Sequence, residues 1–132
     1  MSRKLHLRIW NGRFAVCRLP PQEPVPTWFS TTGEFTSVSR TREELSIVCA
    51  EDAVPPGIQC AKGWRILEVQ GPLDFTQTGI LASLAAPLAD AGVSIFAIST
   101  YDTDYVLVEE QHLDSAVHAL RAAGHTVEQD VG

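Results

Sequence analysis

The segment 99–104 carries side chains that could hold a small charged molecule. It reads Ser-Thr-Tyr-Asp-Thr-Asp, lies between two apolar runs, and contains no Gly, Asn or Pro, the usual turn residues. A carboxylate at Asp102 or Asp104 can accept hydrogen bonds from an ammonium group, and the hydroxyls of Ser99 and Thr100 can donate or accept. The segment therefore predicts a polar turn between two strands that holds the charges of a ligand.

The segment 74–80, Asp-Phe-Thr-Gln-Thr-Gly-Ile, supplies the complementary chemistry. The first N–H groups of a helix have no partner within the helix, and the helix dipole favours an anion there. A helix that starts near Gln77 and Thr78 can therefore bind a carboxylate, and Gly79 lets a ligand approach the backbone closely. With Asp104 facing this helix start, the two segments would bind the carboxylate and the ammonium of a free amino acid.

The same residues also have ordinary structural roles. Asp74 either caps the helix or contacts the ligand. Ser99 and Thr100 either bond the backbone of their own turn or contact the ligand, and Asp102 fits a solvated turn position. Tyr101 is either a lid or part of a dimer interface. With both roles open, the candidate ligand-binding residues are Asp74, Gln77, Thr78, Gly79, Ile80, Ser99, Thr100, Tyr101 and Asp104.

No pattern in the chain predicts catalysis or a cofactor. Ser99, Asp102 and His112 could suggest a hydrolase triad, but no G-x-S-x-G elbow is present. Adjacent carboxylates such as Glu109 and Glu110 would point to opposite faces of a strand. The segment GPLDFTQTG lacks the Lys and the glycines of a phosphate-binding loop. We therefore expect a protein that is not an enzyme and needs no cofactor.

Composition narrows the class of protein further. The 132 residues, 45% of them hydrophobic, fit one compact domain or two very small ones, and the net charge of −6 argues against a nucleic-acid partner. No apolar run approaches the roughly 20 residues of a membrane-spanning helix. Cys17, Cys49 and Cys60 match no zinc or redox spacing, which is consistent with free thiols packed in a reducing compartment. We expect a cytoplasmic protein without a membrane partner.

Two sets of secondary-structure elements are expected to position the polar segments. In the N-terminal part, Asn11-Gly12 between two apolar runs predicts a β-hairpin, and two further strands flank a turn at 41–43. Four prolines within 20–26 allow at most a short helix at 25–29, and 51–63 reads as a linker. The C-terminal part reads strand, helix, strand, strand, helix, strand, which is the ferredoxin-like βαββαβ order. These elements are expected at 64–70, 76–92, 93–99, 104–108, 109–124 and 125–129.

The chain also repeats itself. Residues 34–51 align without a gap on residues 94–111, so that Ser39 meets Ser99 and Glu44 meets Asp104. We infer a degenerate duplication in which the first copy has lost most of its helices to proline. The expected division is a degenerate N-terminal subdomain at 1–62 and a complete domain at 63–132.

The second copy has a family resemblance. GPLDFTQTGILASLAAPLADAGVSIFAISTYDTDYVLV closely resembles the ACT domain, and more narrowly the tandem-ACT branch that includes the CASTOR arginine sensors and the regulatory part of lysine-sensitive aspartate kinases. The resemblance is strong over 64–127 and weaker over 5–60. Its most specific parts are G-I-L-A with A-P-L-A-x-A-G, and STYDTDYVLV.

The resemblance implies an amino-acid site between ACT domains, across a side-by-side homodimer. The positions that match the contacts of the arginine sensors are Asp74, Gln77, Gly79, Ile80, Thr100, Tyr101 and Asp104. Gln77 is neutral where the arginine-sensing pattern carries an acid, so arginine, lysine and other amino acids stay open as ligands. The competing interpretation is a dimeric adaptor that binds a protein partner and no small molecule, with Trp10, Trp28, Phe29 and Trp64 as its surface.

Overall fold

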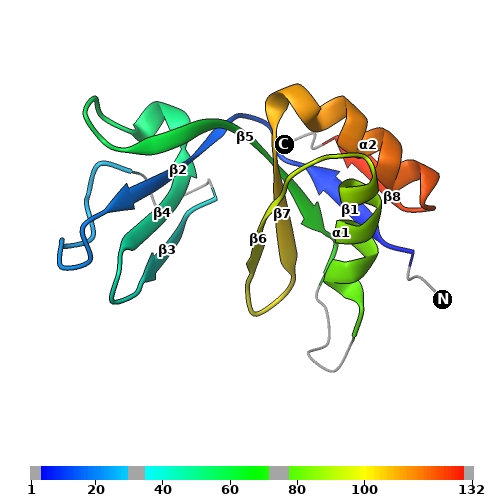
Figure 1. Ribbon diagram of the computed structural model, residues 1–132, viewed down its shortest axis with the longest axis horizontal. Helices are drawn as coiled ribbons and strands as arrows, with labels where there is room; N and C mark the ends of the chain where they lie inside the picture. Colours follow the sequence, from blue (N-terminus) through cyan, green and yellow to red (C-terminus); the bar gives the residue numbers. More distant parts are fainter. Residues whose placement is uncertain (1–3, 30–34, 72–77, 130–132) are drawn as a thin grey trace. The chain divides into compact units, whose positions relative to one another are not determined.

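The computed structural model describes residues 4–29, 35–71 and 78–129. In these ranges the chain forms strands, two α-helices and two short 3-10 turns (Figure 1). The strands are β1 His6–Ile9, β2 Phe14–Leu19, β3 Ser37–Arg40, β4 Leu45–Ala50, β5 Cys60–Val69, β6 Phe96–Ser99, β7 Asp104–Glu109 and β8 Thr126–Gln129. The helices are α1 Ile80–Asp90 and α2 Leu113–Ala122, and the 3-10 turns are η1 Glu51–Ala53 and η2 Glu110–His112.

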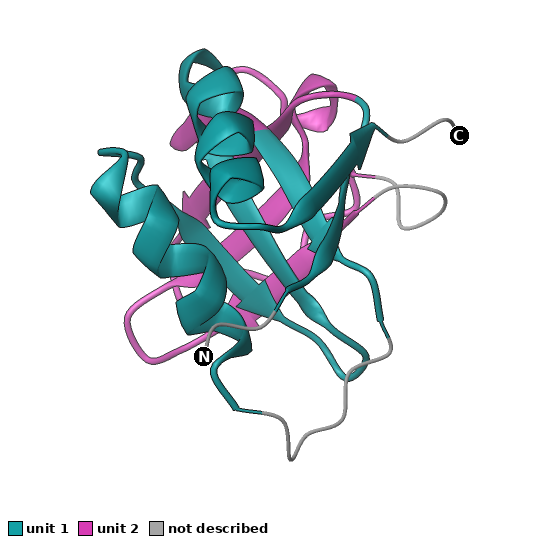
Figure 2. Cartoon of the chain, turned by 90° about the vertical axis from the view of Figure 1, so that its right-hand side faces the viewer, with its two compact units in different colours: residues 1–11, 65–132 teal, residues 12–64 magenta. Residues whose placement is uncertain are grey.

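The chain divides into two compact units (Figure 2). Unit 1 contains residues 1–11 and 65–132, and unit 2 contains residues 12–64. The division within β5, after Trp64, lies close to the expected boundary at 62/63. The first eleven residues differ from the expectation, because the structure groups them with the C-terminal part of the chain.

Unit 1 is a sheet in the order β6-β7-β5-β1-β8, with α1 and α2 packed on one face. The core lies between the sheet and the helices. Its buried residues are Leu67 and Val69 of β5, Val106 and Val108 of β7, and Leu7, Ile9, Leu84, Leu88, Val93, Ala116, Leu120 and Val127. Both helices contribute apolar residues at helical spacing, which is why they bury one face. This arrangement confirms the predicted α+β, ferredoxin-like order from residue 64 onward.

The hairpin predicted at Asn11-Gly12 is wrong. β1 and β2 do not pair with each other; β1 pairs antiparallel with β5 (Leu7 opposite Val69) and parallel with β8, whereas β2 pairs with β4 and with the first half of β5. Gly12 does adopt the positive φ of 92° that the Asn-Gly signal indicates, but the chain there passes from unit 1 to unit 2. The long strand β5, which begins inside the predicted linker, offers partners to both strands.

Unit 2 repeats the sheet of unit 1 without its helices. Its strand order is β3-β4-β2 followed by residues 60–64 of β5, and its core contains Ala15, Cys17, Phe29, Leu45, Ile47 and Cys49. Among its described residues the structure has no α-helix, only η1, and 25–29 is not helical, with bends at 27–29 where the sequence allowed a short helix. Unit 2 is therefore the degenerate copy that the proline-rich segment predicted.

The hairpins of the two units correspond at a shift of 59 residues, not 60. Arg40 lies opposite Leu45 in β3–β4, as Ser99 lies opposite Asp104 in β6–β7. The burial of β4 and β7 agrees at this shift, with three consecutive buried residues in each strand, and η1 and η2 also follow at a shift of 59. The gapless alignment at a shift of 60 is therefore one residue out of register, because similarity between amino-acid types does not show which residues pair across the strands.

Candidate functional site

The first half of the candidate site is the start of α1. Gly79 is its N-cap, with a left-handed φ of 77°, and it is exposed. The carbonyl oxygen of Gly79 accepts the backbone N–H of Ser83 at 2.9 Å and the Ser83 hydroxyl at 2.8 Å. The Gly79 residue itself offers no side chain to cap the first N–H groups. Ile80 is 6% exposed and anchors the first turn in the core, so the helix start is held in place with its backbone exposed at Thr78 and Gly79.

The second half is the turn between β6 and β7, which closes through its own threonines. The Thr100 N–H donates to the Thr103 carbonyl at 2.8 Å, and the Thr100 hydroxyl donates to the same oxygen at 3.1 Å. The Thr103 N–H in turn donates to the Thr100 hydroxyl oxygen at 3.4 Å. These bonds explain how a turn without Gly, Asn or Pro is stable. Thr100 therefore has a structural role in the turn that does not depend on a ligand.

Thr103 is a positioning residue that the sequence analysis missed. It is one of two polar side chains that the structure buries among its described residues, at 4% exposure. Its hydroxyl donates to the Val69 carbonyl at 2.7 Å, which fixes the turn to the end of β5. The only sequence signal for this role would have been its position one residue before a strand, which many solvated threonines share.

Asp104 is the first residue of β7. It stands opposite Ser99 in the register of β6 and β7, and the Ser99 hydroxyl donates to its carboxylate oxygen Oδ1 at 2.5 Å. Side chains alternate along a strand, so Asp104 projects to the same face as Val106 and Val108, which is the face that the helices cover. The carboxylate is half-buried there.

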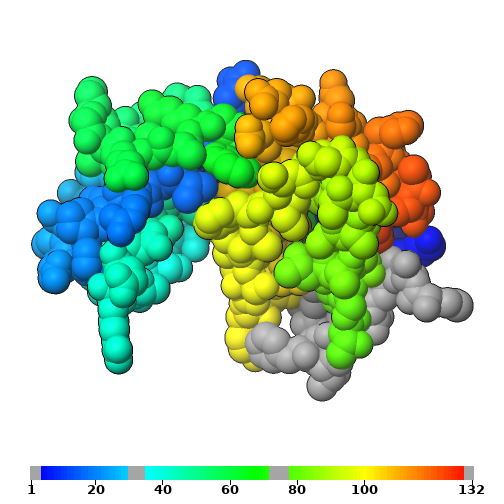
Figure 3. Space-filling view, viewed as in Figure 1, coloured from blue at the N-terminus to red at the C-terminus, as the bar shows by residue number. Residues whose placement is uncertain are grey.

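Both halves lie at the same end of unit 1. In two views at right angles, the start of α1 and the β6–β7 turn occupy its lower end (Figures 1 and 2), and both elements reach the surface in the space-filling view (Figure 3). Of the nine candidates, seven are brought to this end: Thr78, Gly79, Ile80, Ser99, Thr100, Tyr101 and Asp104. Asp74 and Gln77 lie outside the described residues.

The Tyr101 side chain in this turn is 80% exposed, the most of any large hydrophobic side chain among the described residues. A cavity of about 450 Å³ lies along α1 and includes Gly79, at the start of that helix, in its lining. Ser83, Pro87 and the buried His125 also line this cavity. The helix start is therefore next to a hollow of the size that a small ligand fills.

The opposite face of the sheet holds a second polar cluster. The Trp10 ring N–H donates to the Glu68 carboxylate at 2.8 Å, and the Trp10 and Tyr105 rings meet edge to face at 6.4 Å. Burial, and then the carboxylates of Glu68 and Asp102, raise the pKa of Tyr105, while a hydrogen bond with Thr100 lowers it. This phenol therefore stays protonated at neutral pH and is no candidate for a general base.

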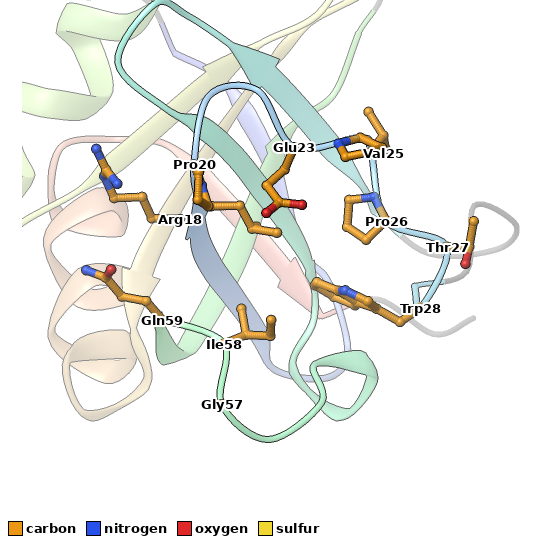
Figure 4. A pocket seen from close by; sticks show the side chains of 12 residues that line it. Arg18, Pro20, Glu23, Val25, Pro26, Thr27, Trp28, Gly57, Ile58 and Gln59 are labelled. Atoms are coloured by element: carbon orange, nitrogen blue, oxygen red, sulfur yellow. The ribbon is translucent and has the colours of Figure 1, made fainter.

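Unit 2 contains a separate pocket of about 640 Å³ (Figure 4). Its walls come from Arg18–Pro20, Glu23–Trp28 and Gly57–Gln59. None of the nine candidate residues lies there. In the described parts of both units, no three His, Cys, Asp or Glu side chains gather as a metal site, and no described helix is long and apolar enough to span a membrane.

Comparison with known proteins identifies the fold of the site. A model of the ACT domain matches residues 59–122, which include the helix start and the β6–β7 turn. The chain belongs to the ACT domain family. A second family model, for an N-terminal domain, matches residues 12–57, which lie within unit 2.

Similar proteins support the same assignment. Cytosolic arginine sensor for mTORC1 subunit 1 of Bos taurus is 35% identical over 98 residues, which are 66% of this chain and 30% of the sensor. The chain thus spans about a third of the length of that curated relative. A crystal structure of a protein from Agobacterium tumefaciens is 37% identical, with a TM-score of 0.92 over 99% of this chain and 97% of the other.

The fold also occurs in metabolic enzymes. The ligand-free regulatory subunit of aspartate kinase from Thermus thermophilus is 12% identical, with a TM-score of 0.64 over 89% of this chain and 96% of the subunit. At this identity the likeness shows the shared fold alone.

Proposed function

We propose that this protein is a non-catalytic regulatory protein that binds one free amino acid at the end of unit 1. The observation that carries the proposal is the register of Asp104, which begins β7 opposite Ser99 and alternates in phase with the core residues Val106 and Val108, in a hairpin whose turn lies at the end of unit 1 where α1 begins (Figure 1). The exposed backbone at Gly79 takes the ligand carboxylate, since helix N-termini favour anions. Asp104 takes the ammonium, with Ser99 holding its Oδ1 oxygen in place.

The family supports this proposal. A relative that shares 35% identity over 98 residues is named as an arginine sensor, and ACT folds form the regulatory subunit of an aspartate kinase. We further propose a cytoplasmic homodimer in which two copies of unit 1 bring their sites together. Asp74 and Gln77 stay ligand contacts predicted from the sequence, and Tyr101 covers the site or contacts the second copy.

The test is a thermal-shift screen of the full chain against the twenty amino acids. A ligand at about 100 times its Kd adds roughly 2.7 kcal/mol of stability, which corresponds to several degrees for a chain of this size. Asp104→Asn keeps an acceptor for the Ser99 hydroxyl but removes the charge, so the shift should disappear. Asp102→Asn removes the same charge from an exposed neighbour and should leave the shift intact.

Two results would count against the proposal. If an amino acid stabilises Asp104→Asn as well as the wild type, the ammonium does not bind at Asp104. If none of the twenty amino acids raises the Tm, the adaptor interpretation gains, and the 80% exposed Tyr101 is then its best contact residue. Tyr101→Ser should in that case change the molar mass measured by light scattering.

A further inference from the structure

The three thiols of unit 2 project from neighbouring strands into one core. Cys17 on β2 lies directly opposite Cys60 on β5, and Cys49 on β4 lies opposite Ala15, two residues before Cys17. All three cysteines carry thiols rather than disulfides. Cys17 and Cys49 are each 1% exposed, whereas Cys60 is half-buried. The Cys17 thiol is within hydrogen-bonding reach of both of the other thiols.

The register makes one pair suitable for a disulfide. The Arg18 N–H donates to the Gln59 carbonyl at 2.9 Å, so Arg18 and Gln59 form a hydrogen-bonded pair. The next pair along, Cys17 and Cys60, is then a non-hydrogen-bonded pair, in which Cα atoms lie about 4.5 Å apart and side chains are close. That separation falls inside the range of about 4.4–6.8 Å for disulfides. Cys49 is diagonal to Cys17, where Cα atoms are about 7–8 Å apart.

We propose that Cys17 and Cys60 form a reversible disulfide when unit 2 meets a small disulfide such as glutathione disulfide. The Cys60 thiolate attacks one sulfur of the oxidant, its S–S bond breaks, and one glutathione thiolate leaves. The Cys17 thiol then loses its proton to solvent and attacks Cys60 Sγ. This step breaks the mixed disulfide, forms the Cys17–Cys60 bond and releases the second glutathione thiolate.

The order of attack follows from exposure and from charge. Cys60 is the thiol of the pair that solvent reaches. Burial, followed by the neighbouring Cys49 and Cys60, raises the pKa of Cys17 to about 12, so it is a neutral thiol near pH 7 and does not react first. Once Cys60 is joined to glutathione it carries no charge, and it can no longer oppose ionisation of Cys17.

The bond would act on the pocket of unit 2. Arg18 follows Cys17 in β2, Ile58 and Gln59 precede Cys60, and all three of these neighbours line the pocket (Figure 4). A disulfide between Cys17 and Cys60 would therefore add a covalent link between β2 and β5 next to this part of the pocket lining. The amino-acid site proposed for unit 1 would keep all of its contacts.

The experiment is incubation of the reduced full chain with glutathione disulfide, followed by intact mass and non-reducing peptide mapping. Cleavage after Glu51 separates Cys49 from Cys60. We expect the wild type to lose two hydrogen atoms, to retain no glutathione, and to link the Cys17 and Cys60 peptides. Cys17→Ala should instead retain one glutathione on Cys60, and Cys60→Ala should not react.

Cys49→Ala is the matched control and should form the same disulfide as the wild type. The wild-type peptide map decides the question even if Cys17→Ala does not fold. A wild type that retains glutathione on Cys60, a link that includes Cys49, or a chain that stays fully reduced would each overturn the proposal.

Discussion

In α1 the Ser83 carbonyl would ordinarily accept a hydrogen bond from the backbone N–H of residue 87, but Pro87 has none. The ring Nε2 of His125 lies 2.9 Å from that carbonyl oxygen, and the His125 Nδ1 accepts the N–H of Leu5 at 3.1 Å. These two bonds assign the ring proton to Nε2. His125 is 4% exposed. It joins α1 to Leu5, the residue before β1, and supplies the donor that the proline removes.

The size of the effect can be worked out from these contacts. His125→Ala removes two hydrogen bonds and a buried ring, and we expect the free energy of unfolding to fall by about 2–4 kcal/mol. Pro87→Ala provides a backbone N–H for the Ser83 carbonyl and removes a helix-interior proline. Alone it should stabilise the chain by up to about 3 kcal/mol, less the roughly 0.4–1 kcal/mol that proline contributes through the unfolded state.

The two substitutions should be coupled. When residue 87 is Ala, loss of His125 no longer leaves the Ser83 carbonyl without a donor, so His125→Ala should cost about 1–2 kcal/mol less than it does in the wild type. Urea unfolding of the four proteins, followed by far-UV circular dichroism, measures this difference. His118→Ala, at an exposed position of α2, is the control and should change stability by less than about 0.5 kcal/mol in both backgrounds. A coupling below about 0.3 kcal/mol would refute the reasoning.

Three further substitutions test the local arguments. Gly79→Ala should lower stability by about 1–2 kcal/mol, because φ is 77° and nothing lies within 4 Å of the added Cβ, so the cost is backbone strain alone; an unchanged urea midpoint would contradict this. Thr103→Val keeps the shape of the side chain but loses the hydrogen bond to the Val69 carbonyl, and we expect the free energy of unfolding to fall by about 1–2 kcal/mol. An unchanged free energy of unfolding would show that this bond does not hold the turn. Because burial raises the pKa of Cys17 from 9.0 to about 12, the folded state holds this proton more tightly than the unfolded state. Wild-type stability should therefore fall, relative to Cys17→Ala, by up to about 1.4 kcal/mol per pH unit between pH 9 and 12; parallel pH profiles would show that the thiol is not shielded.

The secondary-structure elements that could be predicted are those that depend on residues close together in the sequence. The amphipathic spacing of Leu84 and Leu88 predicts α1, and the short apolar run of β7 predicts a strand, since each pattern depends on neighbours along the chain. Pairing is not local. Gly12 has the positive φ of a hairpin turn but Asn11 does not, and no hairpin forms, because β5 is long enough to pair with β1 and with β2 and competes for both. The register of the repeat was missed for the same reason.

The candidate site shows the same division. Residue type and order were enough to predict that Ser99 and Asp104 stand at the two ends of one turn. The burial of Thr103 against the Val69 carbonyl could not be predicted, since it depends on where β5 ends in space. Nor could the sequence decide between turn bonding and ligand contact for Thr100, and the structure shows the turn bonds.

Comparison of the two hairpins separates what the turn needs from what it does not. At the shift of 59, Thr41 corresponds to Thr100, and both close their turns in the same way, with an N–H and a hydroxyl directed at the carbonyl three residues later. Leu45 corresponds to Asp104, and it is fully buried in the core of unit 2. The same turn thus forms with an apolar residue where unit 1 has a carboxylate. Turn closure explains the threonines. Asp104 accepts a hydrogen bond from Ser99, but the turn of unit 2 closes with Leu45 at the corresponding position, so closure does not require a carboxylate there. A half-buried carboxylate that the turn does not require fits the ligand-binding role that we propose for Asp104.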